Sequence, residues 1–108
     1  MAFQHQTLAE GRWFQFTLAE QLGNIGSEVH RVIRARGDEK RFEAAVFRAL
    51  ELFDLTIGDP RWRKRLKELT RAREVFCDSI LGGTEYGTSL EDLDKYFYYF
   101  AYAARSNR

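Results

Sequence analysis

The clearest chemistry in this sequence is phosphate binding by a run of basic side chains. Between residues 61 and 73, seven basic residues accompany one acid, Glu68. They are Arg61, Arg63, Lys64, Arg65, Lys67, Arg71 and Arg73. On a helix, one solvent-facing arc of about 100° would hold Arg63, Lys64, Lys67 and Arg71. We predict that this ridge and Arg61 bind nucleic acid, because such a ridge can follow a phosphate backbone. The alternative is an ordinary solvated face.

Arg73 differs from the rest of the run. On the helical wheel it falls among apolar positions, at the inner side or the boundary of the helix. A guanidinium in such a place needs an acidic partner. We expect a structural ion pair with Asp54 or Glu28.

A second candidate surface is aromatic and lies in Lys95-Tyr-Phe-Tyr-Tyr-Phe-Ala-Tyr102. One stripe of this helix, which includes Leu90, Leu93, Phe97 and Phe100, should face the core. Three rings point away from that stripe: Tyr98, Tyr99 and Tyr102. Tyrosine is enriched at interfaces and can stack on bases, so we predict contacts with a subunit or a partner. Alternatively, the rings pack at the helix flanks with their hydroxyls in water.

Further large apolar side chains lie off the expected core stripes. They are Trp13 and Phe16 in the first helical segment and Leu52 and Leu55 in the second. Together with the tyrosines they exceed what a small bundle should leave in water, so we predict a homo-oligomer with these residues at its interface. The alternative is a buried stripe on each helix that is wider than the arcs considered.

The sequence contains no recognisable catalytic constellation. His5 and His30 have no Asp, Cys or Ser at a characteristic spacing, and no Glu-x-x-His pair suggests a di-iron site. Gly82-Gly83 is not followed by the Lys-Ser/Thr of a phosphate loop. Cys77 is expected to be a buried thiol. We therefore predict a protein that is not an enzyme and that needs no cofactor and no metal.

Composition indicates one ordinary globular domain over residues 1–108, with flexible tails at 1–11 and 105–108. The chain is 44% hydrophobic and 31% charged, with a net charge of +1. A single cysteine excludes an internal disulfide and fits the cytoplasm. No apolar run approaches the ~20 residues of a membrane span, and no secretory signal is recognisable.

Helical periodicity and a single proline predict an all-α fold. The expected helices cover about 12–36, 38–57, 60–81 and 89–104. Asp38, Asp59-Pro60 and a Ser89–Asp92 capping box provide start signals. Helices of this length joined by short loops favour an antiparallel up-down-up-down four-helix bundle.

Two glycines interrupt the first expected helix at a cost of about 1 kcal/mol each. Gly23 and Gly26 are expected to permit close approach of another helix or subunit, with a kink as the alternative. Asn24 and Ser27 beside them could form hydrogen bonds across that contact.

Three phrases carry a family resemblance: Trp13-Phe-Gln-Phe-Thr-Leu-Ala-Glu-Gln-Leu-Gly-Asn-Ile-Gly-Ser-Glu28, Leu55-Thr-Ile-Gly-Asp-Pro-Arg-Trp62 and Lys95-Tyr-Phe. With the length and the basic third helix, they resemble the four-helix-bundle family of the ribosomal-RNA intervening-sequence proteins and the accessory variability determinant proteins of diversity-generating retroelements. The resemblance implies a homo-pentamer that binds a reverse transcriptase and its structured RNA. This chain is nearly neutral, whereas those accessory proteins are strongly basic. A protein-binding scaffold without a nucleic-acid role is the alternative function.

Overall fold

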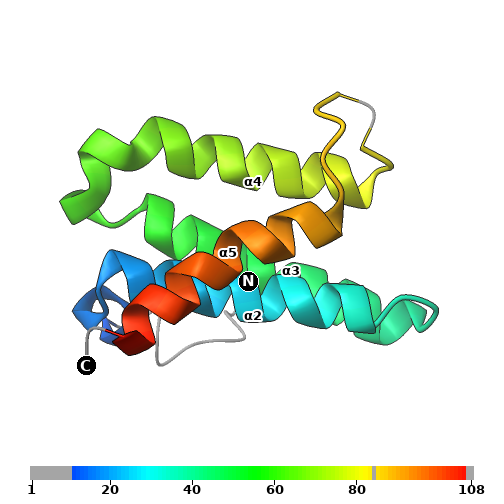
Figure 1. The fold of residues 1–108 in the computed structure, drawn as a ribbon, viewed down its shortest axis with the longest axis horizontal. Coiled ribbons are helices and arrows are strands. Elements are labelled where there is room, and N and C mark those ends of the chain that lie inside the picture. Colours follow the sequence, from blue (N-terminus) through cyan, green and yellow to red (C-terminus); the bar gives the residue numbers. More distant parts are fainter. Residues whose placement is uncertain (1–10, 84, 107–108) are drawn as a thin grey trace.

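The computed structural model describes residues 11–83 and 85–106, and in these residues the fold is entirely helical (Figure 1). Four α-helices and two short 3-10 helices follow one another in the order η1 (Arg12–Gln15), α2 (Leu18–Arg34), α3 (Glu39–Ile57), η2 (Pro60–Arg65), α4 (Leu66–Ile80) and α5 (Leu90–Ser106). The predicted all-α class with four helices is confirmed. Across these two described ranges, no helix has both the length and the apolar character needed to cross a bilayer.

Helix α2 is the central element of the fold. It packs against α3 and α5, while α4 packs against α3 and makes a smaller contact with α5. In Figure 1, α5 runs obliquely across α2, and α4 lies along one edge of the molecule. Helix α4 leaves much of its surface in solvent.

The first helix begins later than the sequence pattern suggested. Instead of one helix over 12–36, the chain forms η1, passes through extended backbone at Phe16, and starts α2 after Thr17. The Thr17 hydroxyl accepts a hydrogen bond from the Glu20 amide at 3.1 Å, and the Glu20 carboxylate accepts one from the Thr17 amide at 2.9 Å. This capping box, Thr-x-x-Glu, is visible in the sequence but was missed.

The other predicted start signals perform as expected. The Asp38 side chain caps α3 by accepting a hydrogen bond from the Arg41 amide. Ser89 and Asp92 form reciprocal hydrogen bonds at the start of α5, so aspartate substitutes for the usual glutamate. Helix α5 continues to Ser106, beyond the expected end at 104, and residues 107–108 lie outside the described part.

The third expected helix is divided in two. The Asp59 carboxylate accepts a hydrogen bond from the Arg61 amide at 3.0 Å, as the Asp-Pro signal predicted. Trp62, however, has non-helical angles (φ −107°, ψ 25°), and the chain forms the 3-10 helix η2 before α4 begins at Leu66. At this point the Trp62 ring donates a hydrogen bond to Gln21 of α2 at 2.8 Å.

The core contains two residues that the sequence placed outside it. Trp13 is 1% exposed and Leu52 3% exposed, so the expectation that they face away from the core is wrong. Trp13 reaches the core because η1 folds back toward α3. Leu52 is buried because the buried stripe of α3 is wider than the stripe expected from helical periodicity. Phe16 and Leu55 are partly buried and pack against the same core.

Gly23 and Gly26 lie where two helices approach each other closely. A Cβ atom built on Gly26 would lie 2.5 Å from the Phe97 Cβ, and one on Gly23 would lie 3.0 Å from the Ala101 Cα. The predicted close approach is confirmed, and the approaching helix is α5 of the same chain. Asn24 and Ser27 do not bridge this contact, since they donate to the backbone oxygens of Glu20 and Gly23 in their own helix.

Candidate functional site

The predicted phosphate-binding ridge lies on η2 and α4. Arg63, Lys64, Lys67 and Arg71 are all exposed. Arg63, Lys64 and Lys67 take part in none of the ion pairs found within residues 11–83 and 85–106. The Arg71 guanidinium lies over the Tyr86 ring, 5.2 Å from its centroid. These cations therefore remain available to an external anion.

The neighbouring basic residues of the same run are already engaged. Arg65 pairs with Glu68 at 2.9 Å, and Arg73 pairs with Asp54 at 2.8 Å. The ion pair predicted for Arg73 is thus confirmed with the first of its two expected partners. Glu28, the second, binds other arginines.

Arg61 is engaged within the fold. Its Nη2 donates to an Asp59 carboxylate oxygen at 2.7 Å and to the Phe16 carbonyl at 2.8 Å. Its guanidinium also lies 4.4 Å from the Trp62 ring centroid. This geometry separates Arg61 from the ridge to which the sequence assigned it. The hydrogen bond from Arg61 lowers the pKa of the buried Asp59 carboxyl, although burial acts in the opposite direction.

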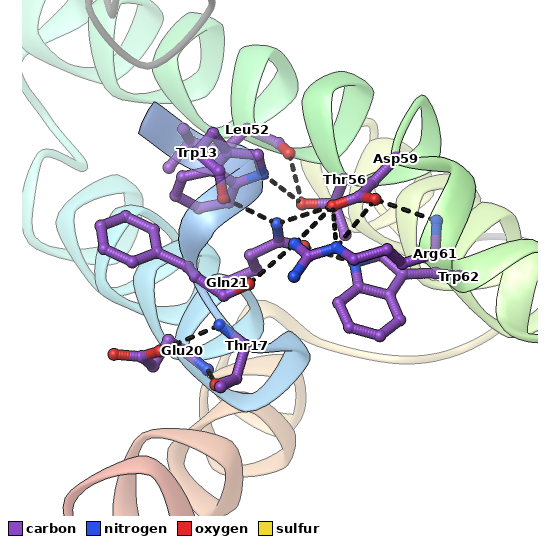
Figure 2. Close-up of polar contacts among 10 residues, drawn as sticks. Trp13, Thr17, Glu20, Gln21, Leu52, Thr56, Asp59, Arg61 and Trp62 are labelled. Carbon is purple, nitrogen blue, oxygen red and sulfur yellow. Dashed lines mark hydrogen bonds and ion pairs between the residues drawn. The ribbon is translucent and has the colours of Figure 1, made fainter. Parts of the chain in front are cut away.

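Asp59 and Arg61 belong to a polar network that joins η1, α2, α3 and η2 (Figure 2). The Gln21 amide group donates to the Trp13 carbonyl at 2.9 Å and to Asp59 at 3.2 Å, while its oxygen accepts from the Trp62 indole at 2.8 Å. The Trp13 indole donates to the Thr56 hydroxyl at 3.0 Å. All these polar groups are satisfied inside the protein, so the network has a structural role.

The three tyrosines of α5 form an exposed face, which we call the tyrosine face. Tyr98, Tyr99 and Tyr102 are 58%, 72% and 59% exposed. The wheel prediction that they point away from the core is confirmed. Tyr98 and Tyr99 contact each other edge to face, with centroids 6.2 Å apart. Their contact with a subunit or a partner stays a prediction.

Tyr96, on the flank of the same helix, contacts α4. Its hydroxyl donates to the Glu68 carboxylate at 3.0 Å. Burial and this hydrogen bond raise the pKa of Tyr96 to about 12. Tyr96 thus joins α5 to α4 and does not belong to the tyrosine face.

The sequence interpretation missed a second group of cations. Arg31 and Arg34 on α2 and Arg41 and Arg48 on α3 line one groove. The hydrophobic pattern could not reveal this cluster, because the residues come from two helices and meet only through the packing of α2 against α3.

In the described part of the chain, the histidine that pairs with a carboxylate is His30. Its Nδ1 lies 3.4 Å from Asp94 Oδ2, and the two side chains are 53% and 36% exposed. Within residues 11–83 and 85–106, no three His, Cys, Asp or Glu side chains gather where they could hold a metal ion. Cys77 is partly buried, and His5 lies outside the described residues.

Comparisons with protein-family models, with curated proteins and with solved structures found no match to this chain. A function for this chain is therefore a proposal, which rests on the surfaces described above and on the resemblance seen in the sequence.

Proposed function

We propose that this chain is a non-enzymatic, oligomeric accessory protein that binds nucleic acid through η2 and α4. The observation that carries the proposal is the difference within one basic run. Arg61, Arg65 and Arg73 are held by acidic partners, whereas the exposed Arg63, Lys64 and Lys67 are not among those ion pairs. Unpaired cations along one face are what a phosphate backbone requires.

The family resemblance extends this proposal. It suggests structured RNA as the nucleic acid and a reverse transcriptase of a diversity-generating retroelement as the protein partner, with the chain acting in the cytoplasm as a pentamer. We also propose that the four α-helices pack in an antiparallel up-down-up-down order. Within the chain itself, the tyrosine face supports the oligomeric part, because exposed aromatic rings are enriched where proteins meet.

The salt dependence of binding to structured RNA tests this function. Four phosphate contacts predict a slope of log K against log salt of about −3 and a loss of about 50-fold in affinity between 50 and 200 mM salt. The triple variant R63E/K64E/K67E should abolish this binding without unfolding the protein. As a matched control, R12E/K40E/K95E makes the same charge change at exposed positions elsewhere. Equal losses in both variants, or binding insensitive to salt, would contradict the proposal.

A protein-binding scaffold is the second candidate, and the tyrosine face is the observation that favours it. If this candidate is right, replacing Tyr98, Tyr99 and Tyr102 by serine removes partner or subunit binding, while the charge reversal on η2 and α4 has no effect. Light scattering tests the oligomer separately. A clean monomer of 12.7 kDa would contradict it.

A further inference from the structure

A concave groove of about 760 Å³ lies between α2, α3 and α5. None of its lining residues comes from η2 or α4, so it is separate from the phosphate-binding ridge. Four arginines contribute to its walls: Arg31, Arg34, Arg41 and Arg48. Its volume falls within the range of about 300–1,000 Å³ typical of small-molecule sites.

A buried carboxylate organises two of these arginines. Glu28 is 4% exposed; its Oε1 accepts from Arg31 Nη1 at 2.7 Å and its Oε2 accepts from Arg48 Nε at 3.3 Å. One negative charge thus holds two guanidiniums, leaving a net positive charge. Each arginine keeps further N–H groups that Glu28 does not use. Guanidiniums fixed in this way are pre-organised for a phosphate, which they bind through paired hydrogen bonds.

The other two arginines add charge at the edge of the groove. Arg34 and Arg41 are exposed, and neither takes part in the ion pairs of the described residues. Among the described residues that line the groove, the acid is Asp94, whose carboxylate lies 3.4 Å from His30 Nδ1. The balance of charge in the groove therefore remains positive and favours an anionic ligand.

The α5 side of the groove has a different character. Phe97, Ala101 and Tyr98 line it, and Gly23 and Gly26 of α2 lie against the first two. Tyr98 is 58% exposed and offers its ring to a flat partner. Base–aromatic stacking is a common way to bind an unpaired base.

We propose that this groove binds one nucleotide unit, with the phosphate held by the arginines and the base placed against Tyr98. This site goes beyond the ridge on α4, since it recognises a base together with a phosphate and has the volume of a small ligand. The nucleotide is supplied either free or as part of a single strand. An acidic peptide would use the arginines but not the tyrosine ring, so the aromatic wall favours the nucleotide.

Nuclear magnetic resonance on the isotopically labelled full chain tests the site. The probes are AMP, a short oligouridylate and inorganic phosphate, each titrated to about 10 mM, a range that captures millimolar affinity. We expect the amides of Arg31, Arg34 and Tyr98 to shift together. The exposed-residue variants R34A/R41A and Y98A should each weaken binding about tenfold or more, because the first removes two of the four arginines of the groove and the second removes the aromatic ring. Circular dichroism checks that both variants are folded.

The outcomes distinguish binding in the groove from binding at the ridge on η2 and α4. Binding of AMP supports a free nucleotide, and binding of the oligouridylate alone supports a strand. The variant R12E/K40E/K95E, whose exposed positions line neither the groove nor the ridge, should leave AMP binding unchanged. The amide shifts of Arg31, Arg34 and Tyr98 report the groove alone, so a failure of the ridge on η2 and α4 can be told apart from a failure of the groove. The proposal is overturned if neither nucleotide probe shifts these amides, if inorganic phosphate binds as tightly as AMP, or if oligoglutamate competes as well as AMP does.

Discussion

Helices α2 and α4 have similar lengths but hold very different positions in this protein. Helix α2 lies between α3 and α5 and buries residues along its whole length, from Gln21 to Val32. Helix α4 buries only Leu69 and Phe76. A helix with such a narrow buried stripe can carry charge on most of its remaining surface. This explains how η2 and α4 can carry the unpaired cations of the ridge.

The two helices also begin differently. A reciprocal capping box starts α2, whereas α4 follows a 3-10 segment and its first residue has no side-chain cap. The contacts that hold α4 include two buried side chains, the Arg73–Asp54 ion pair and the Tyr96–Glu68 hydrogen bond, together with partly buried side chains at Ala72, Val75 and Ile80. We expect α4 to depend on each contact more strongly than α2 does.

The largest effect should come from Phe76→Ala. Phe76 is fully buried, and its ring lies 5.5 Å from that of Phe53. Its truncation should lower the free energy of unfolding by about 4 kcal/mol, because it removes apolar contact and leaves a cavity. Chemical denaturation measures the change. Phe47→Ala is the matched control, since Phe47 is 36% exposed and should cost far less. Similar losses in both would show that Phe76 does not anchor α4.

Gly26→Val tests the close contact between α2 and α5. Even a Cβ on this residue would lie 2.5 Å from the Phe97 Cβ, so the two helices must separate. We expect a loss of about 3 kcal/mol from overpacking. The control is Asn24→Val, which introduces the same side chain at an exposed position of the same helix. If thermal or chemical unfolding shows the same stability for both variants, then α2 and α5 are not tightly packed at Gly26.

Asp59→Asn should cost about 2 kcal/mol near neutral pH, because it weakens hydrogen bonds to a charged partner in a buried place. The pKa of Asp59 is lowered in the fold, so its contribution is complete above the ordinary pKa of about 4 and disappears as pH falls through the lowered value. The gap between wild type and variant should therefore close in acid. Asp54→Asn, which disrupts an exposed ion pair, should cost less than about 1 kcal/mol.

The smallest effect is expected for Tyr96→Phe, at about 1 kcal/mol at neutral pH. The folded pKa of Tyr96 is about 12, above the ordinary value of about 10. Stability from the protonated phenol is thus present below pH 10 and is lost as pH rises toward 12. Unfolding experiments in alkali should show a steeper loss for wild type than for the variant. Tyr99→Phe, at a residue 72% exposed, should behave like wild type.

Local signals in the sequence predicted much of this architecture. The caps at Asp38 and Ser89, the break at Asp59-Pro60 and the outward direction of Tyr98, Tyr99 and Tyr102 follow from the identities and spacing of nearby residues. Even the Thr17 capping box that divides the first segment is present in the sequence. Short-range hydrogen bonding and helical periodicity decide these features, and both can be deduced without a tertiary structure.

Tertiary packing decided the rest. Trp13 enters the core because Thr56, distant in sequence, accepts its indole hydrogen bond, and Arg61 leaves the ridge because a buried Asp59 holds it. The groove exists because α3 and α5 flank α2 and bring its arginines beside Arg41, Arg48 and Tyr98. A wheel describes one helix at a time, whereas burial and charge pairing depend on which helices become neighbours. The sequence alone thus determined the helical class, most of the helix starts and the exposed tyrosines of α5, and the packing determined the core at Trp13 and Leu52 and which charges remain free to bind.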